Sequence, residues 1–261
     1  MVNVASPAAP DLMGYQPTSR PIWMEALVPL EWVALHASPV YYGFGVPHGH
    51  GEPVVVVPGF LGSDRYLTEM VLWLRRIGYK PYFSGIGRNV DCPELLTQRL
   101  LITVEQAFSD TQQPVTIIGH SLGGMLARAT GHRAPTMVKQ VITMGSPFRA
   151  VKAHPIVLSA ANLVRSNIVR ERSHRREVTN TCFTPECTCG FVTTMKRDAE
   201  TDDHGTFERA AIFSKCDGVV DWRSCMEDDE VLNREVSSTH IGMAFNPDVY
   251  RTVANLLAGV A

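Results

Sequence analysis

Residues 116–124 read Thr-Ile-Ile-Gly-His-Ser-Leu-Gly-Gly, an apolar, β-branched run that passes through a glycine-flanked serine into a helical pattern. The five residues from Gly119 to Gly123 form a G-x-S-x-G motif, and the strand-to-helix turn of this motif holds its serine, here Ser121, in a strained backbone conformation. Gly119 and Gly123 have no side chains that would clash in so tight a turn. The motif therefore predicts that Ser121 is a nucleophile above the end of a strand, and a chance Gly/Ser turn is the weaker interpretation.

Short apolar runs and helical patterns alternate on both sides of this motif. Continuous apolar or β-branched runs are typical of strands buried on both faces of a sheet. The runs lie at 54–57, 81–83, 115–118, 138–144, 210–214 and 234–237, and the helical patterns lie at 24–36, 65–77, 93–108, 122–132 and 248–258. This alternation predicts an α/β fold with a mostly parallel central sheet and helices on both faces. The length of 261 residues suits a single domain, residues 1–261.

Two segments depart from the alternation. Residues 1–50 are expected to form an N-terminal arm, extended over 1–22 because of its Pro, Ala and Ser content, followed by the first helix. Residues 150–207 show no strand signal, although 161–178 reads as a helix with an apolar stripe and an arginine-rich face. We expect this insertion to form a helical cap over the carboxyl edge of the sheet, where α/β proteins place their binding sites.

A serine alone is a poor nucleophile, so the motif requires a histidine base and an orienting acid, and in this architecture they follow in the order Ser, acid, His. His240 lies in the final loop and is the one histidine beyond Asp217. Asp217 follows the strand at 210–214 and precedes Gly-Val-Val, so its side chain can turn back toward His240. Asp221 is the alternative acid, although an Asp about one helical turn further on is also an ordinary N-cap.

Two backbone N–H groups are expected to form an oxyanion hole. The N–H of Leu122 lies at the start of a helix, where the helix dipole also favours negative charge. The second N–H is expected from the Pro-Gly-Phe-Leu-Gly-Ser loop at 58–63, because Gly59 permits a sharp turn that directs the amide of Phe60 at the site. An ordinary strand-ending turn at Gly59 is compatible with this role.

Five motifs spread over about four fifths of the chain resemble an α/β-hydrolase of the bacterial lipase/esterase type. They are VVVVPGFLGS (54–63), GHSLGG (119–124), MGSPF (144–148), DGVVDW (217–222) and STHIGM (238–243). The resemblance implies an α/β-hydrolase fold and a serine enzyme that hydrolyses carboxylic esters without a cofactor or metal. It also implies Ser121, Asp217 and His240 as the catalytic triad and the Phe60 and Leu122 amides as the oxyanion hole.

The substrate is expected to be a small-molecule or lipid ester. Many bacterial lipases have His-Gly where this chain has Pro58-Gly59, which weakens any transfer of lipase substrate preference. The apolar positions near the start of the insertion predict a covered pocket for short to medium acyl chains. The alternatives are a thioesterase or acyltransferase with the same triad and a lipase on long-chain triglycerides. A binding module is the hypothesis outside enzymes, but it would not need the serine, acid and histidine together.

Charge and hydropathy exclude several partner classes. The net charge of −2 offers no field that would recruit nucleic acid, and no run of 18 apolar residues predicts a transmembrane segment. The N-terminal stretch does not read as a secretory signal, so we expect a cytoplasmic protein, although six cysteines leave an oxidising location open. The arginine cluster at 165–176 reads as a solvated helix face and leaves peripheral contact with an anionic lipid surface open. No sequence feature decides the oligomeric state.

The cysteines permit several interpretations. Three of them lie near two histidines of the insertion and could supply zinc ligands: Cys182, Cys187, Cys189, His174 and His204. Their spacing matches no common structural zinc pattern, so a disulfide in the cap and ordinary reduced thiols rank ahead of zinc. Cys216 and Cys225 flank the loop of Asp217 and could form a disulfide that pins it.

Overall fold

A six-stranded parallel sheet in the order β3-β2-β4-β5-β7-β8 forms the core of the computed structural model, which describes residues 16–17, 21–172, 187–200 and 207–260. The strands are β2 (Pro53–Val57), β3 (Lys80–Phe83), β4 (Val115–His120), β5 (Val138–Met144), β7 (Glu208–Phe213) and β8 (Asn233–Glu235). The predicted α/β fold with a parallel central sheet is confirmed. Each of the six predicted strands overlaps one of these strands.

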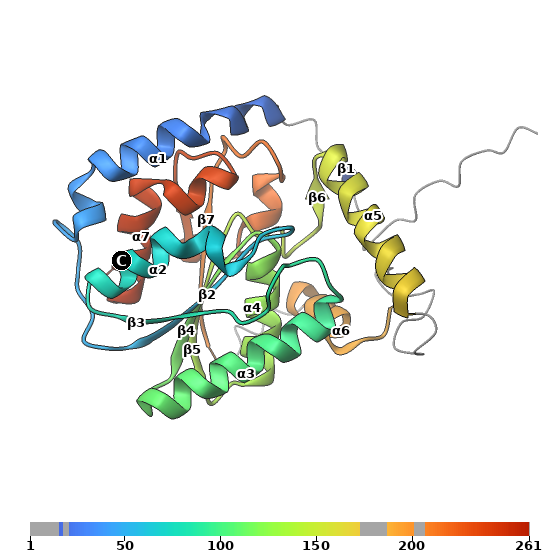
Figure 1. The fold of residues 1–261 in the computed structure, drawn as a ribbon, viewed down its shortest axis with the longest axis horizontal. Helices are drawn as coiled ribbons and strands as arrows, with labels where there is room; N and C mark the ends of the chain where they lie inside the picture. The colour runs from blue at the N-terminus through green and yellow to red at the C-terminus, as the bar shows by residue number, and fades with distance from the viewer. Residues whose placement is uncertain (1–15, 18–20, 173–186, 201–206, 261) are drawn as a thin grey trace, which may run out of the picture.

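The helices cover both faces of the sheet. They are α1 (Val28–Ala37), α2 (Thr68–Arg76), α3 (Pro93–Thr111), α4 (Leu122–Arg133), α5 (Pro155–Arg172), α6 (Gly190–Glu200) and α7 (Pro247–Leu257). Val54 and Val56 of β2 pack in the hydrophobic cluster of α2 and α7, whereas Val55 and Val57 pack in the cluster of α3, α4 and α6. Figure 1 shows α2 and α7 on one side of the strands and α4 and α6 on the other. Because alternate side chains of a strand point to opposite faces, a strand covered on both faces must be apolar throughout.

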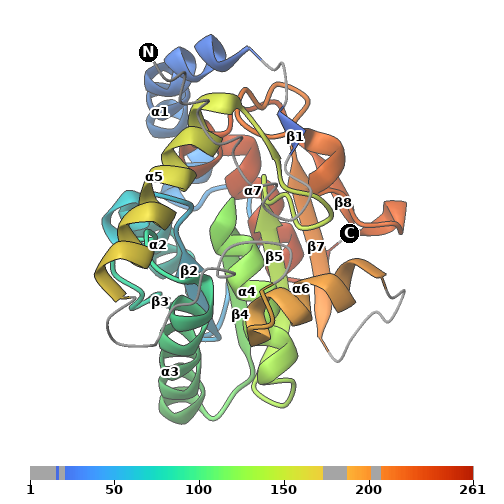
Figure 2. The ribbon, with the colours of Figure 1, turned by 90° about the vertical axis from the view of Figure 1, so that its right-hand side faces the viewer.

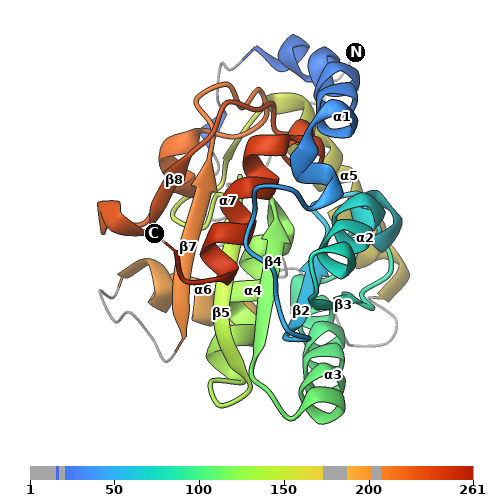
Figure 3. The same cartoon turned by 90° about the vertical axis from the view of Figure 1, so that its left-hand side faces the viewer.

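The N-terminal helical segment and the start of the insertion lie at the carboxyl end of the sheet. The segment begins as a 3₁₀ helix (Ile22–Leu27) and continues as α1. Figure 2 shows α1 and α5 near the end at which β7 terminates. Figure 3 shows α1 from the other side, at the same end of the molecule. This is the edge at which a parallel sheet presents its binding loops.

Two short strands join the arm to the insertion. β1 (Gln16–Pro17) pairs in parallel with β6 (Lys152–Ala153). The sequence predicted an extended arm, with which β1 agrees, and no strand in 150–207, which β6 corrects. Strands of two residues are too short to show a period of two in the sequence, and pairing with a distant segment creates them.

The second half of the insertion packs on the flank of the sheet. Phe191, Val192 and Met195 of α6, a helix that the sequence did not predict, are buried in the cluster of α3 and α4. Asp198 of α6 pairs with Arg128 of α4, so this acidic residue neutralises a buried arginine. The predicted cap helix also begins six residues earlier than expected, at Pro155, and the part of it beyond residue 172 lies outside the described residues.

Within the part of the chain that the structure describes, no helix has the length and apolar character that crossing a membrane requires.

Candidate active site

The G-x-S-x-G motif forms a sharp turn between β4 and α4. Ser121 has φ 53° and ψ −126°, a positive-φ conformation that a non-glycine residue rarely adopts. A Cβ atom on Gly119 would lie 2.4 Å from the Cα atom of Gly124, and one on Gly123 would lie 2.4 Å from the carbonyl oxygen of Val57. Both positions therefore require glycine, and their lack of side chains lets the strand and helix approach closely enough to lift Ser121 out of the sheet.

Replacement of Gly119 by alanine is expected to lower the free energy of unfolding by about 3 kcal/mol, because the backbone of Gly124 must move. Gly87→Ala is the comparison, since Gly87, unlike Gly119, has a positive φ of 75° and has no atom within 4 Å of the position of a Cβ. We expect this variant to cost only about 1 kcal/mol, from the left-handed conformation. Denaturant unfolding measures both. A loss for Gly119→Ala no larger than that for Gly87→Ala would contradict the expected cost of crowding at Gly119.

Asp217 and His240 form a buried hydrogen-bonded pair. Nδ1–H of His240 donates to Oδ2 of Asp217 at 2.6 Å, and both side chains are almost inaccessible to solvent. The second oxygen of Asp217, Oδ1, accepts from the backbone N–H groups of Val219 and Val220, each at 2.8 Å. These contacts hold the carboxylate in place and leave Nε2 of His240 without the proton, which is the tautomer that a general base requires.

The environment of His240 favours its protonated form. Burial by itself disfavours the charged ring and lowers its pKa, but the nearby carboxylate of Asp217 opposes this, and the net effect is a raised pKa. The charge and hydrogen bond of Asp217, together with the charge of Glu25, therefore outweigh the loss of solvation. This arrangement stabilises an imidazolium, which is the form that a base takes after it has removed a proton.

Asp221, the alternative acid, is used elsewhere. Its side chain caps the 3₁₀ helix Trp222–Cys225 and accepts from the backbone N–H of Arg223 at 3.2 Å. The same carboxylate lies 3.6 Å from the guanidinium of Arg223. The structure therefore brings Asp217, and not Asp221, to His240.

The turn at Ser121, here called the elbow, and the loop that carries His240, the histidine loop, meet beside the end of β5. Nε2–H of His120, the residue before Ser121, donates to the carbonyl oxygen of His240 at 2.9 Å. Gly145, directly after β5, has φ 56°, and a Cβ there would lie 3.2 Å from Nδ1 of His240 and 3.3 Å from Oδ2 of Asp217. The N–H of Ser121 in turn donates to the carbonyl of the last residue of β5. The loops that follow β4, β7 and β8 thus bring the three predicted residues together beside the end of β5.

His120 is a functional candidate that the sequence reasoning did not single out. It is buried, and burial together with the neighbouring His240 lowers its pKa to about 3, so it stays neutral at any working pH. A neutral His120 donates one fixed hydrogen bond to the histidine loop. Its only signal in the sequence is its place between Gly119 and Ser121.

The loop after β2 is closed by hydrogen bonds. The N–H of Gly62 donates to the carbonyl of Gly59, and the N–H of Leu61 donates to the carbonyl of Asn89, both at 3.0 Å. The side-chain amide of Asn89 also donates to the carbonyl of Pro58 at 2.8 Å. Asn89, another residue that the sequence analysis missed, therefore holds both arms of the turn around Phe60.

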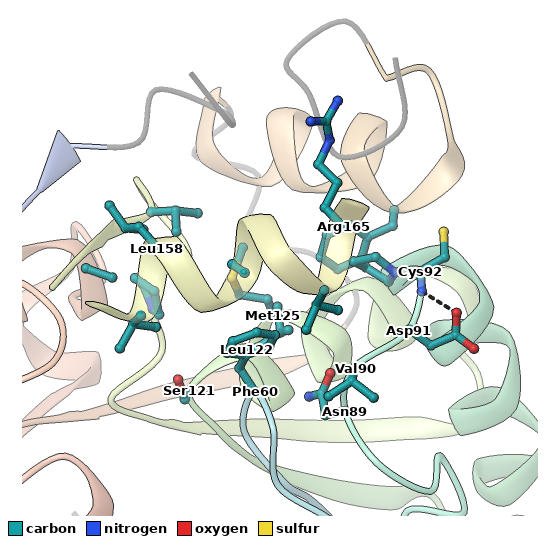
Figure 4. A pocket seen from close by; sticks show the side chains of 18 of the residues that line it. Phe60, Asn89, Val90, Asp91, Cys92, Ser121, Leu122, Met125, Leu158 and Arg165 are labelled. Atoms are coloured by element: carbon teal, nitrogen blue, oxygen red, sulfur yellow. Dashed lines mark hydrogen bonds between the residues drawn. The ribbon is translucent and has the colours of Figure 1, made fainter. Parts of the chain in front are cut away.

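This turn lies directly against the elbow. A Cβ on Gly59 would lie 3.0 Å from Cβ of Ser121, so a larger residue at Gly59 would force the loop away. Phe60, Ser121 and Leu122 line the same cavity, and Figure 4 shows them together at its floor. The predicted oxyanion residues are therefore brought beside the predicted nucleophile.

The cavity is mainly apolar and runs from Ser121 beneath α5 toward α6. Val157, Leu158 and Val164 of α5 line it, with Phe191 and Val192 at the side of α6. Arg165 extends from α5 away from Ser121 (Figure 4). Two of the apolar positions that the sequence assigned to the cap, Ile156 and Leu163, are instead 62% and 69% exposed and do not line the cavity.

The structure shows no disulfide between the two cysteines beside the acid, which the sequence had left open. Cys216 and Cys225 are both free thiols, as are Cys187 and Cys189 at the cavity wall. His174, Cys182 and His204 of the considered zinc set lie outside the described residues. Over the ranges that the structure describes, no group of three or more His, Cys, Asp or Glu side chains is arranged to hold a metal ion.

Comparison with known proteins adds three kinds of match. A family model described as a PGAP1-like alpha/beta domain matches residues 94–212. The chain is 30% identical over 139 residues to a triacylglycerol lipase from Burkholderia plantarii, and 32% identical over 106 residues to one from Pseudarthrobacter phenanthrenivorans. These alignments cover 49% and 37% of this chain and only 39% and 33% of the two lipases.

Solved structures match over most of the chain. The mature form of a lipase from Bacillus licheniformis has a TM-score of 0.53 and 14% identity, with 83% of this chain and 95% of that chain covered. Naproxen esterase from Bacillus subtilis has a TM-score of 0.50 and 12% identity, with 88% and 98% covered. At these identities the likeness shows the fold.

Proposed function

We propose that this protein, an α/β-hydrolase of the lipase/esterase type, is a serine carboxylic ester hydrolase that works through an acyl-enzyme. One observation carries the proposal: a buried Asp217–His240 pair lies beside a strained serine elbow, at the floor of an apolar cavity. A strained serine turn is costly to keep, and the base and acid beside it supply a chemical reason for it.

The proposed reaction assigns one role to each residue. Ser121 Oγ attacks the ester carbonyl while Nε2 of His240 takes its proton, and Asp217 holds the ring and stabilises its positive charge. The N–H groups of Phe60 and Leu122 bind the oxyanion. His240 then gives its proton to the leaving alcohol. Water attacks the resulting acyl-enzyme with the same base, and the acid product is released as Ser121 recovers its proton.

The cavity suggests the substrate class. It is lined largely by apolar side chains and is roofed by α5, so it can hold an aliphatic acyl chain of limited length. Each methylene that fits contributes about 0.8 kcal/mol until the cavity is full. We therefore propose short to medium acyl esters as substrates.

An acyl series tests this proposal. We expect kcat/KM on p-nitrophenyl esters to rise from acetate to roughly butyrate or octanoate and then to fall, because longer chains exceed the cavity. The measurement is kcat/KM for each ester below its solubility limit. An emulsion of long-chain triglyceride should be hydrolysed poorly in a parallel assay.

A lipase acting on long-chain triglycerides is the second candidate, favoured by the triacylglycerol lipases among the relatives. It predicts a maximum at palmitate and a jump in rate once the substrate passes its solubility limit. That pair of results would replace the short-chain proposal with the lipase one. A protein that hydrolyses none of these esters would contradict both.

A further inference from the structure

One carboxylate from the N-terminal segment contacts the loops of both the proposed acid and the proposed base. Oε1 of Glu25 accepts from the backbone N–H of Gly218 at 3.2 Å and from that of His240 at 3.0 Å, and Oε2 accepts from that of Ile241 at 2.8 Å. Gly218 directly follows Asp217. A single side chain therefore joins two loops that come from different parts of the chain.

We propose that Glu25 is a positioning residue for the reaction, which sets the distance and orientation between Asp217 and His240 by holding the backbones of both loops. The inference rests on the proposed ester hydrolase function. Three N–H groups converge on this carboxylate, a set of charge-assisted hydrogen bonds stronger than bonds between neutral groups. A small misplacement of a base is costly, because proton transfer requires an aligned short contact.

The opposite side of the histidine backbone is held by the elbow. His120 donates to the carbonyl of His240, while Glu25 accepts from the N–H of the same residue. Asp217 holds Nδ1 of the ring. With these three contacts in place, the ring has little freedom except to present Nε2. Loss of the Glu25 carboxylate would leave the backbone N–H of His240 without this partner. It would also remove the link between the loop of Asp217 and the loop of His240.

Glu31 of the same segment provides a natural comparison. Its oxygens accept from the backbone N–H of Thr239 at 3.0 Å, from the Thr239 hydroxyl at 2.8 Å and from the side-chain amide of Asn246 at 3.3 Å. Glu31 thus supports the same loop but contacts neither His240 nor the loop of Asp217. A variant of Glu31 reports the effect of weakening the segment without the proposed positioning.

Charge gives the two glutamates different effects on the ring. The groups around His240 are the carboxylates of Asp217 and Glu25, the neutral ring of His120 and the hydroxyl of Tyr66, which donates to the carbonyl of Ile241. Burial raises the pKa of Tyr66 far above its usual value, so this group stays neutral. Asp217 and Glu25 both raise the pKa of His240 against the effect of burial. Removal of the charge of Glu25 must therefore lower that pKa.

The first experiment compares Glu25→Gln with Glu31→Gln. For Glu25→Gln we expect kcat to fall about 10- to 100-fold with KM little changed, because the reacting groups are misplaced while the cavity is intact. In a plot of kcat/KM against pH, the acidic limb reports the pKa of the base in the free enzyme. This limb should move to lower pH in Glu25→Gln. Glu31→Gln should lower the melting temperature but leave this limb in place. The inference would be overturned if the acidic limb lay at the same pH in wild type and Glu25→Gln. It would also be overturned if the limb moved by the same amount in Glu25→Gln and Glu31→Gln.

A second variant separates position from charge. Glu25→Asp keeps the charge but withdraws the carboxylate by one methylene, so it should lose contacts with the N–H groups. We expect kcat to fall while the acidic limb stays nearer to that of wild type than in Glu25→Gln. Wild-type kcat in Glu25→Asp would show that these hydrogen bonds do not position the base.

Titration of the His240 ring by NMR provides a readout that does not need activity. The signal is assigned by its loss in His240→Ala, and it should titrate at lower pH in Glu25→Gln than in wild type. If wild type hydrolyses no ester, the proposed function fails, but the titration still tests whether Glu25 acts on His240. An unchanged titration in an active enzyme would refute only the role of Glu25.

Discussion

Ser121→Ala abolishes ester hydrolysis while the protein remains folded: this is the largest effect that we expect. Loss of a triad nucleophile typically lowers turnover by about 10⁴- to 10⁶-fold, because no acyl-enzyme can form. Alanine removes only the hydroxyl, so the packing of the elbow should persist. The measurements are hydrolysis of a p-nitrophenyl ester by the purified variant and a thermal melt beside wild type.

A fluorophosphonate label identifies the nucleophile directly. It should modify Ser121 in wild type and fail to modify Ser121→Ala. Ser159→Ala is the matched control, since Ser159 lies exposed on α5, away from the elbow, and both labelling and hydrolysis should be unaffected there. Hydrolysis near the wild-type rate in Ser121→Ala would end the proposed mechanism, and labelling elsewhere would assign the nucleophile to another residue.

Asp217→Asn should reduce turnover by about 10⁴-fold near neutral pH, the second largest effect expected. An amide at this position donates to Nδ1 and favours the imidazole tautomer that carries its proton on Nε2, which cannot act as the base. The variant also loses the carboxylate that raises the pKa of His240, so the residual activity should have its acidic limb at lower pH.

Asp221→Asn is the control for this experiment. An asparagine can still cap the 3₁₀ helix as Asp221 does, so we expect turnover within a few-fold of wild type. The pH profile of kcat/KM and the melting temperature are measured for both variants. The reverse ranking, with Asp221→Asn the slower enzyme, would transfer the role of the acid to Asp221.

Most of the sheet could be predicted because its strands carry a local signal. β2 is buried on both faces and therefore appears as an unbroken valine run, and β4 leads directly into the elbow motif. Much of α5 was also recognisable, because residues 161–172 carry an apolar stripe and an arginine-rich face in the sequence. The second half of the insertion was not, since α6 follows a cysteine-rich stretch and becomes helical against α3 and α4.

Some of the site residues could be predicted from the sequence, and others could not. Ser121 could be singled out from its motif, and Asp217 and His240 from their order and from their places in loops after strands. His120 and Asn89 had no distinguishing pattern, because a backbone carbonyl that accepts from their side chains leaves no trace in the sequence at that position. The free thiols of Cys216 and Cys225 show that proximity in sequence to the acid did not imply a bond between them.

By itself, the sequence determined the α/β architecture, the strained serine turn and the candidates for base and acid, because each depends on a few neighbouring residues with a fixed period or steric requirement. Only the tertiary structure decided which acid reaches His240, which insertion residues line the cavity and that Glu25 holds both loops. The Glu25 and Gly218 positions are 193 residues apart. Such contacts depend on how helices, strands and loops pack in the folded protein, and no local pattern of residue types predicts them.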